Sequence, residues 1–444
     1  MAQKAATLEI SELMQFFHQE LDDLPDERKP GNNRKYEIKD AVMAAFSVFF
    51  TQSPSFLDHQ RLMKSNKGKD NAESLFSIEK ISGDNQIRNL LDAVPASTVS
   101  GTVQKVYQWL KEKGVLKKFL YLDGEILVAL DGTEYFSSKK INCPHCNCRN
   151  HRNGTTTYFH GCVTPRVVSP NQKQVINLEP EFIKKQDGHQ KQDCENAAVK
   201  RWLNRNHKNK YGYPVTLLGD DLYSHEPVCK LAVKQGYNFI FVCLETSHKT
   251  LYEWLEFLEK SGEVRTVEKK QWDGRKNLIY RYRYASRVPL REGDSSLEVN
   301  WCEVTVINEK TQKTIYQNNW ITNHKITENN VEEIVKAGRS RWKVENEGNN
   351  VLKNHGYNLE HNFGHGQNHL CEFLLSLNLL AFLFHTVWDL VNYTYQKIRE
   401  LLVTRTSFFN DIRTLLKFIW FKNWSEFFSF ILTEYVPFKK VNSS

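Results

Sequence analysis

Three acidic residues stand where the chain changes from an apolar pattern to a polar one. Asp131 follows the apolar run of ILVALDGTEYFSS, Asp220 follows the run of VTLLGDDLYS, and Glu345 lies in the helical pattern RSRWKVENEG. Magnesium prefers oxygen ligands and is held by a few carboxylates. Two divalent ions about 3.5–4 Å apart can activate water and stabilise the leaving oxygen of a phosphodiester. The three carboxylates therefore predict a catalytic site that binds two Mg²⁺ or Mn²⁺ ions.

Both aspartates also have a purely structural interpretation. Asp131 precedes Gly132, and this pair is typical of a turn. Asp220 or Asp221 is also placed to cap the helix expected near His225. Asp220 is preferred as the ligand because it ends the apolar run directly, and the functional interpretation depends on all three motifs together.

A second acid, Glu347, lies two residues after Glu345. At about 100° per residue, the two side chains point some 200° apart around a helix. Steps of four residues place Arg341, Glu345 and Asn349 on one polar stripe that ends at Lys353. We therefore expect Glu345 to be the metal ligand.

These residues need rigid elements to hold them, and the sequence supplies such elements from about Phe119 to Leu244. Apolar strand patterns alternate with helical ones there, which is typical of an α/β unit. The end of the second acidic strand repeats the layout of the first. Both aspartates are therefore expected at the ends of strands in one sheet.

A chain of 444 residues is long enough for two or three domains. We predict a helical, DNA-binding N-terminal domain (1–118), the first part of the catalytic domain (119–244), a β-rich insertion (245–329), the final part of the catalytic domain (330–390) and a helical C-terminal region (391–444). A helical bundle that packs on the next domain is an equally compatible interpretation of the first region.

Taken together, the motifs LDGTEYFSS, LLGDDLYS and RSRWKVENEG resemble those of the DDE transposases of bacterial insertion sequences, in the IS4-like group. Arg341 and Glu345 match the signature of that group. Its tyrosine position is Gly338 here, and its lysine position is Leu352, with Lys353 one residue later. The resemblance covers the chain beyond residue 115 and implies a ribonuclease-H-like catalytic domain.

The resemblance also implies an activity and partners. Such a protein binds terminal inverted repeats, cleaves the element ends through DNA hairpins, joins them to target DNA, and acts as a homodimer bridging the two ends. Two other classes remain open: a ribonuclease-H-like nuclease without strand transfer, and a non-catalytic, transposase-derived DNA-binding regulator. The regulator predicts loss of at least one carboxylate, whereas all three are present.

The charge of the chain favours a polyanionic partner. Lysine and arginine number 60 against 52 acidic residues, which gives a formal charge of +8. Nucleic acid is the preferred partner, ahead of an anionic membrane. The residues predicted to contact DNA are Arg341, Lys353, Arg339, Arg88 and Trp320. Tryptophans of the insertion are more often core residues, and Trp320 would stack on an unpaired base if it is exposed.

Cysteines and histidines gather in the segment CPHCNCRNHRNGTTTYFHGC. Cys143 and Cys146 form half of a structural zinc site, and the candidates to complete it are Cys148, His151, His160 and Cys162, with His160 and Cys162 preferred. A metal-free hairpin is equally compatible. The later group His355, His361, His365 and His369 is interpreted as a glycine-rich loop rather than a metal site.

The most apolar stretch, LCEFLLSLNLLAFLFHTVWDL from Leu370, approaches the length of a membrane span. Polar residues interrupt it, among them Glu372 and Asp389, so a buried helix is expected and no membrane contact. The N-terminus lacks the pattern of a secretory signal. We therefore predict a cytoplasmic, bacterial protein that associates with the nucleoid when bound to DNA.

Overall fold

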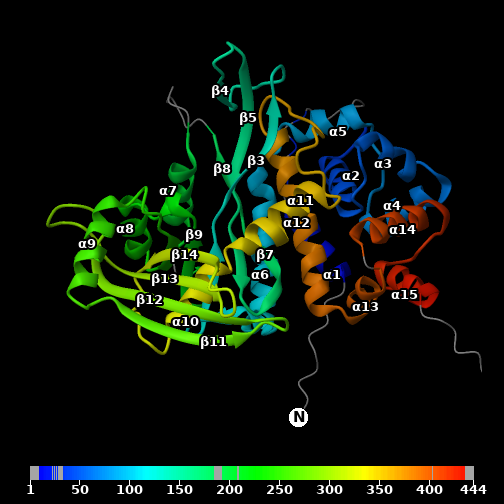
Figure 1. Cartoon of the computed structure of the whole chain (residues 1–444). Coiled ribbons are helices and arrows are strands. Elements are labelled where there is room, and N and C mark those ends of the chain that lie inside the picture. The colour runs from blue at the N-terminus through cyan, green and yellow to red at the C-terminus, as the bar shows by residue number, and fades with distance from the viewer. Residues whose placement is uncertain are drawn as a thin grey trace, which may run out of the picture.

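The computed structural model describes residues 10–22, 24, 26, 28, 34–184, 193–207, 210–402 and 404–435. The protein is a mixed α/β structure, as the sequence predicts. A mixed sheet lies between a helical unit on one side and a strand-rich extension on the other (Figure 1).

The centre of the main sheet is a set of three parallel strands, β2 (Glu125–Ala129), β9 (Val215–Gly219) and β10 (Asn238–Val242). Strands β6 (Arg166–Ser169) and β7 (Gln172–Asn177) continue the sheet antiparallel beyond β2, and the short β1 (Leu120–Tyr121) also pairs with β2. Strands β2 and β9 are buried almost throughout. Their continuous apolar runs fit strands that are covered on both faces.

The predicted insertion extends this sheet. Its strands are β11 (Arg265–Trp272), β12 (Asn277–Pro289), β13 (Glu298–Asn308) and β14 (Thr314–Thr322), and they follow α9 (Lys249–Lys260). Because β14 pairs with β10, the strand order becomes β11-β12-β13-β14-β10-β9-β2-β6-β7. The extension and the C-terminal helices lie on opposite sides of the protein in Figure 1.

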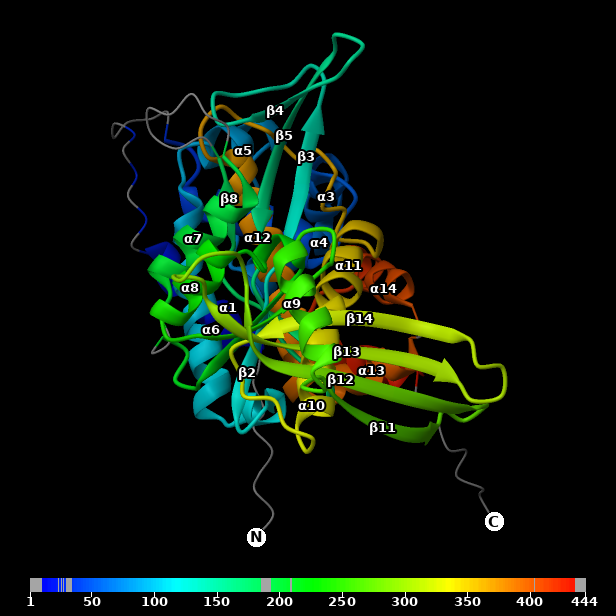
Figure 2. The ribbon, with the colours of Figure 1, turned by 60° about the vertical axis from the view of Figure 1, so that its left-hand side comes forward.

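A second sheet forms an arm. It consists of β3 (Gly132–Ser138), β4 (Asn147–Asn150), β5 (Thr156–Val163) and β8 (Glu181–Ile183), in the order β3-β5-β4 with β8 on β5. The hairpin of β4 and β5 projects beyond the body of the protein (Figures 1 and 2). Strand β3 begins at Gly132, directly after Asp131, so the arm starts at the predicted active site.

The helical unit combines both ends of the chain. The N-terminal helices are α1 (Ile10–Asp22), α2 (Ile38–Phe50), α3 (Phe56–Met63), α4 (Asn66–Phe76), α5 (Asp84–Leu91), the 3₁₀ turn η1 (Ala96–Val99), α6 (Ser100–Glu112) and the 3₁₀ turn η2 (Val115–Phe119). The C-terminal helices are α12 (Leu370–Val391), α13 (Tyr393–Leu401), α14 (Arg405–Phe418) and α15 (Trp424–Tyr435). Asn71 of α4 donates to the carbonyl of Leu416 at 2.9 Å, and Trp424 donates to that of Leu75 at 2.9 Å. The regions predicted separately at 1–118 and 391–444 therefore share one core.

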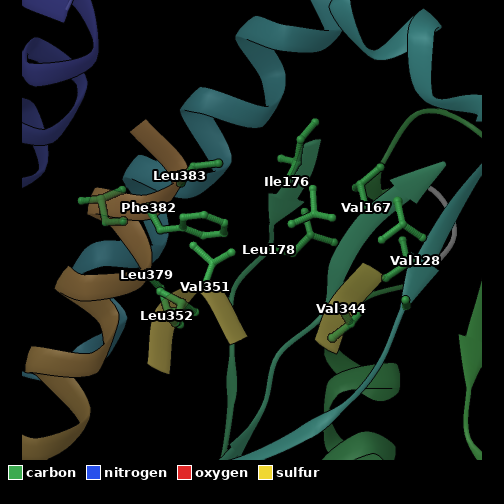
Figure 3. Packing of buried hydrophobic residues seen from close by; sticks show 14 of the residues in the cluster. Val128, Val167, Ile176, Leu178, Val344, Val351, Leu352, Leu379, Phe382 and Leu383 are labelled. Atoms are coloured by element: carbon green, nitrogen blue, oxygen red, sulfur yellow. The ribbon is translucent and has the colours of Figure 1, made fainter. Parts of the chain in front are cut away.

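Helix α12 joins this helical unit to the sheet. Its residues Leu379, Phe382 and Leu383 belong to the same buried core as Val351 and as Ile176 of β7 (Figure 3). Among the described residues, α12 is the one helix long and apolar enough to cross a membrane, and its most apolar window lies entirely inside the protein. The prediction of a buried core helix is confirmed.

Candidate functional site

Asp131 and Asp220 lie level with each other at one edge of the sheet. Strands β2 and β9 run parallel with Ala129 opposite Leu218, and the amide of Leu130 donates to the carbonyl of Leu218 at 2.9 Å. Asp131 and Asp220 each lie two residues beyond this Ala129–Leu218 pair, so they follow the two strands at the same level. Because neighbouring strands are about 4.8 Å apart, the fold brings together two carboxylates that are distant in sequence.

Asp220 and Asp221 contact different parts of the chain. Asp220 caps the 3₁₀ turn η4 (Asp221–Tyr223) by accepting from the amide of Leu222 at 2.9 Å. Asp221 turns toward another part of the chain, where it accepts from the amide of Leu244 at 2.6 Å and lies 3.6 Å from His248. Asp220 therefore caps this turn and not the helix expected near His225, because α8 (Glu226–Lys234) has His225 itself at its N-cap.

Glu345 lies in a short π-helical turn. Helix α10 (Val331–Arg339) is followed by the π-helical turn η5 (Val344–Asn349) and by α11 (Asn350–Asn354). The sequence predicts a regular helix here. π-Helical turns are rare and frequently occur at functional sites, so this irregularity coincides with the predicted third ligand.

The predicted polar stripe converges on Asp131. Asn349 Nδ2 donates to Asp131 Oδ2 at 2.8 Å, and Arg341 Nη1 lies 3.8 Å from Asp131 Oδ1. The negative charge of Glu345 also acts on Asp131. Lys353 takes no part, because it pairs with Glu360 at 3.0 Å.

Glu347 belongs to different surroundings. Its charge acts on Lys343, whose ammonium donates to the carbonyls of Ser169 at 2.7 Å and Pro170 at 3.3 Å. Glu345 is exposed, whereas Glu347 is half-buried. The two glutamates therefore face different environments, with Glu345 on the side of Asp131.

Burial raises the pKa of Asp131 to about 6, while Arg341 opposes the shift and Glu345 adds to it. An ionised Asp131 is therefore costly unless positive charge comes near it. Bound divalent cations would supply that charge.

A buried arginine binds Asn349, the hydrogen-bond partner of Asp131. Arg166 of β6 is 0% exposed, and its Nη1 donates to Asn349 Oδ1 at 2.8 Å and to the carbonyl of Val344 at 3.1 Å. Burial lowers the pKa of Arg166 to about 10. A Cβ on Gly348 would lie 2.6 Å from the same Nη1, so a glycine is required for this close approach. Sequence reasoning missed Arg166 because nothing local in a strand pattern marks a buried charge.

A fourth acid, Glu195, was also missed. It is the first residue of α7 (Glu195–Arg205), and it accepts hydrogen bonds from the Tyr223 hydroxyl and the Gly132 amide. Its charge acts on both Asp131 and Asp220, and burial raises the pKa of Glu195. An acid in the first turn of a helix is common, so the sequence offered no signal for this position.

The oxygen donors fit Mg²⁺ or Mn²⁺ in chemical type. In the described part of the chain, the carboxylates of Asp131, Asp220 and Glu345 do not form a group whose ligand atoms all lie within 4.8 Å of one another. A site with two ions does not require the carboxylates to lie this close together. The two ions are about 3.5–4 Å apart, so carboxylates that bind different ions lie farther from each other than carboxylates that share one ion. The structure therefore does not bring these three carboxylates into one compact ligand group, and their binding of metal stays a prediction.

Two of the predicted DNA contacts line a hollow beside this edge. Arg339 and Arg341 border an open hollow of about 330 Å³ together with Trp342 and Tyr316. The guanidinium of Arg339 lies 4.5 Å from the ring centre of Tyr316. Trp342 is 46% exposed and was not singled out from the sequence.

One other predicted DNA contact is corrected by the structure, and for a second the structure shows partners within the protein. Trp320 of β14 is only 1% exposed, because it packs where Gly338 leaves room, so it presents no face to a base. Arg88 is half-buried, pairs with Asp84 at 3.0 Å, and donates to the carbonyl of Phe363 at 2.8 Å. Its role in this structure is to hold a loop.

A cluster of thiols and imidazoles lies where the arm meets the loop between α11 and α12. It contains Cys143, Cys146, His160 and His365, and one side-chain ligand atom from each lies within 4.8 Å of all the others. The first three were predicted from the sequence. The predicted Cys162 is wrong as a member, since it is buried in β5 outside the group, and His365 replaces it.

The histidine-rich segment is a loop, as expected, but one of its histidines joins this cluster. His355 and His361 are exposed, whereas His365 is buried. The alternative ligand His151 bonds to Thr157 Oγ1 at 2.8 Å. Cys148 lies in β4 outside the group.

A scan of the chain against protein-family models finds no match, and a search of curated proteins finds no relative either. What the site does must therefore be inferred from its residues and their geometry.

Proposed function

We propose that this protein is a DNA transposase that cleaves element ends by metal-dependent phosphodiester hydrolysis and transesterification and joins them to target DNA. One observation carries the proposal. Asp131 and Asp220, which are far apart in sequence, follow neighbouring parallel strands at the same level, and the charge of Glu345 acts on Asp131 from a π-helical turn.

The strand arrangement supports a ribonuclease-H-like catalytic domain as part of this proposal. The parallel strands β2, β9 and β10 continue into the antiparallel strands β6 and β7 on one side. Ligands in open α/β sheets bind beyond the carboxyl ends of the strands. That is the edge at which the carboxylates gather.

Asp131, Asp220 and Glu345 would hold Mg²⁺ or Mn²⁺, which supplies an activated water and stabilises the leaving oxygen. The residues around them have distinct tasks. Arg341 presents a planar guanidinium to a phosphate, and Asn349 fixes the orientation of Asp131 through its 2.8 Å hydrogen bond. Arg166 in turn fixes Asn349.

The surroundings of the site suit DNA. Arg339, Arg341 and the exposed Trp342 border one hollow, which combines phosphate-binding groups with a surface for stacking a base. The arm adds the exposed Lys139, Lys140 and Arg152. Because two element ends must be joined in one reaction, we propose that a homodimer binds the paired inverted repeats.

The test uses the full-length protein, Mg²⁺ and duplex DNA carrying the sequences that flank its gene. We expect nicking at the element ends and transfer of those ends into a plasmid. Asp131→Asn and Asp220→Asn should each reduce both steps at least about 1,000-fold, or about 4 kcal/mol of barrier, while gel shifts stay largely unchanged, because binding depends on basic contacts to phosphates.

Asp221→Asn is the matched control, since that carboxylate faces Leu244 and His248 instead. Nicking without joining would identify a nuclease, and binding without nicking in either metal would identify a regulator. Full cleavage by Asp131→Asn would overturn the assignment of the site.

A further inference from the structure

We propose that Cys143, Cys146, His160 and His365 bind one Zn²⁺ ion, and that this ion fastens the arm to the loop leading from the Glu345 segment into α12. This inference does not depend on the proposed transposase activity. It rests on the geometry of four side chains and on where their segments lie in the fold.

The spacing of the four ligand atoms matches a tetrahedron around zinc. With Zn–S near 2.3 Å and Zn–N near 2.0–2.1 Å, the corners of a tetrahedron lie about 3.8 Å apart for two sulfurs, about 3.6 Å for sulfur and nitrogen, and about 3.3 Å for two nitrogens. The two Sγ atoms are 3.7 Å apart, and the two Nε2 atoms are 3.2 Å apart. The measured sulfur–nitrogen distances are 3.3 and 3.4 Å.

Hydrogen bonding alone explains this arrangement poorly. His160 Nε2 lies within 3.4 Å of Cys143 Sγ, Cys146 Sγ and His365 Nε2 at once. An imidazole nitrogen offers one hydrogen or one lone pair, so it cannot serve three partners well. A single ion at the point that all four atoms surround satisfies every one of them.

A disulfide is also a poor explanation. The Sγ separation of 3.7 Å between Cys143 and Cys146 is far beyond the bonded distance of about 2.05 Å, and both cysteines are free. Two sulfur and two imidazole ligands select zinc over magnesium or calcium, which prefer oxygen.

The orientation of His365 is fixed by a second contact. Its Nδ1 lies 2.9 Å from the carbonyl of Gly366, so Nδ1 carries the hydrogen and donates it. Nε2 is then left with a lone pair that points at the cluster. Metal-binding histidines typically make such a contact through the other ring nitrogen.

The site is closed, as structural zinc sites are. Cys146, His160 and His365 are buried, and the four protein ligands leave no open position for a substrate. The ion is therefore structural, and its effect must be on the segments that it joins.

Those segments connect three parts of the protein. Cys143 and Cys146 lie in the turn before β4, and His160 lies in β5 of the arm. His365 lies in the loop between α11 and α12, and the next residues donate backbone amides to the Asp92 carboxylate: Gln367 and Asn368 at 3.0 Å and Leu370 at 3.1 Å. The ion would thus tie the arm to a loop that is already anchored to the N-terminal helices.

The first test is metal analysis of the full-length protein purified under reducing conditions. We expect about one equivalent of zinc, which is lost in the double variant Cys143→Ser/Cys146→Ser and retained in Cys194→Ser, a change at an exposed thiol outside the cluster. Co²⁺ exchanged into the site should give the visible absorption of a tetrahedral sulfur–nitrogen site. Zinc-free protein that also fails to bind added Zn²⁺ or Co²⁺ would overturn the proposal.

The second test concerns the fastening role of His365. His365→Asn should weaken zinc retention in a chelator titration at least tenfold and speed hydrogen exchange in residues 355–369, whereas His361→Asn, an exposed histidine of the same loop, should change neither. Measurement of exchange makes the test independent of catalysis and of complete unfolding. Unchanged retention and exchange in His365→Asn would remove His365 from the site.

Discussion

The carboxylate edge and the thiol–imidazole cluster are both built from segments far apart in the sequence, yet they differ in compactness and exposure. The cluster is buried, and its four ligand atoms lie within 4.8 Å of one another. The acids at the edge are more open, and Glu345 is exposed. Ionised carboxylates repel one another unless cations lie between them.

This difference indicates two different uses of a metal. A closed set of four soft ligands holds an ion permanently and stabilises the fold. An open set of hard ligands leaves positions for water and a phosphate. Substitutions at the carboxylate edge should therefore affect the rate of cleavage, and substitutions at the cluster should affect stability.

The largest expected effect separates Glu345 from Glu347. Under the proposed function Glu345 is a metal ligand, so Glu345→Gln should reduce cleavage and strand transfer at least about 1,000-fold, where each factor of ten corresponds to about 1.4 kcal/mol. Glu347→Gln should retain at least part of both activities, because Glu347 acts on Lys343 rather than on Asp131. Single-turnover rates on intact and pre-nicked DNA measure both steps. An active Glu345→Gln beside an inactive Glu347→Gln would reverse the assignment.

The next prediction removes one metal at a time. A chelator selective for zinc should lower the free energy of unfolding by several kcal/mol, because binding of a structural metal is coupled to folding. Withholding Mg²⁺ should stop cleavage but leave the unfolding midpoint nearly unchanged. Thermal unfolding and nicking assays on the same samples test both halves. A zinc-depleted protein of unchanged stability would contradict the contrast between the two sites.

The sequence predicted the parts of both sites that local patterns mark. The apolar runs that end at Asp131 and Asp220 are local features, and so is the Cys-x-x-Cys pair. His365 could not be assigned to the cluster, because it lies 219 positions from Cys146 and only the fold brings them together.

The same reason explains the other misses. The π-helical turn at Val344–Asn349 contacts Arg166 of β6 through the carbonyl of Val344, and a helical pattern does not reveal such a distant partner. Trp320 was predicted to contact DNA from its residue type alone, whereas pairing of β14 with β10 and β13 buries it. The α/β class was predictable from alternating patterns, but the joining of both helical ends into one core was not.

A smaller effect is expected at Gly348, beneath the carboxylate edge. In Gly348→Ala the new Cβ would lie 2.6 Å from Arg166 Nη1, so the guanidinium or the π-helical turn must shift. Overpacking of this kind costs about 1–3 kcal/mol, and the displaced Asn349 should also slow cleavage. Urea unfolding and nicking rates measure the two effects. Gly83→Ala is the control, because its nearest neighbour is 3.8 Å away, and equal losses in both variants would argue against a specific role for the Arg166 contact.

The smallest expected effect is on the pH dependence of stability, and it concerns two buried histidines that lie outside both sites. They serve as a reference for the histidines of the cluster, because they bind no metal. Burial lowers the pKa of His59 and of His385 to about 3. His385 Nε2 donates to the carbonyl of Phe50 at 2.9 Å, and Nδ1 accepts from the Tyr395 hydroxyl at 3.0 Å, so the neutral ring is fully bonded. The unfolded chain binds these protons near pH 6.5 and the folded chain does not, so stability must fall as the pH falls below about 6.5.

Each of these histidines contributes a slope of at most about 1.4 kcal/mol per pH unit between the two pKa values. Urea unfolding of the zinc-depleted protein at pH 7.0 and 5.5 removes the competition between protons and zinc at His160 and His365. Burial also lowers the pKa of His18, His248 and His324, so these histidines add to the same slope. His385→Asn should lower the overall stability but reduce the loss between the two pH values, because a titrating group has been removed. If the pH dependence of His385→Asn equals that of the unsubstituted protein, His385 is not a source of the slope. Any additional acid sensitivity seen only with zinc bound would then belong to the cluster, where protons compete with the metal for the imidazoles.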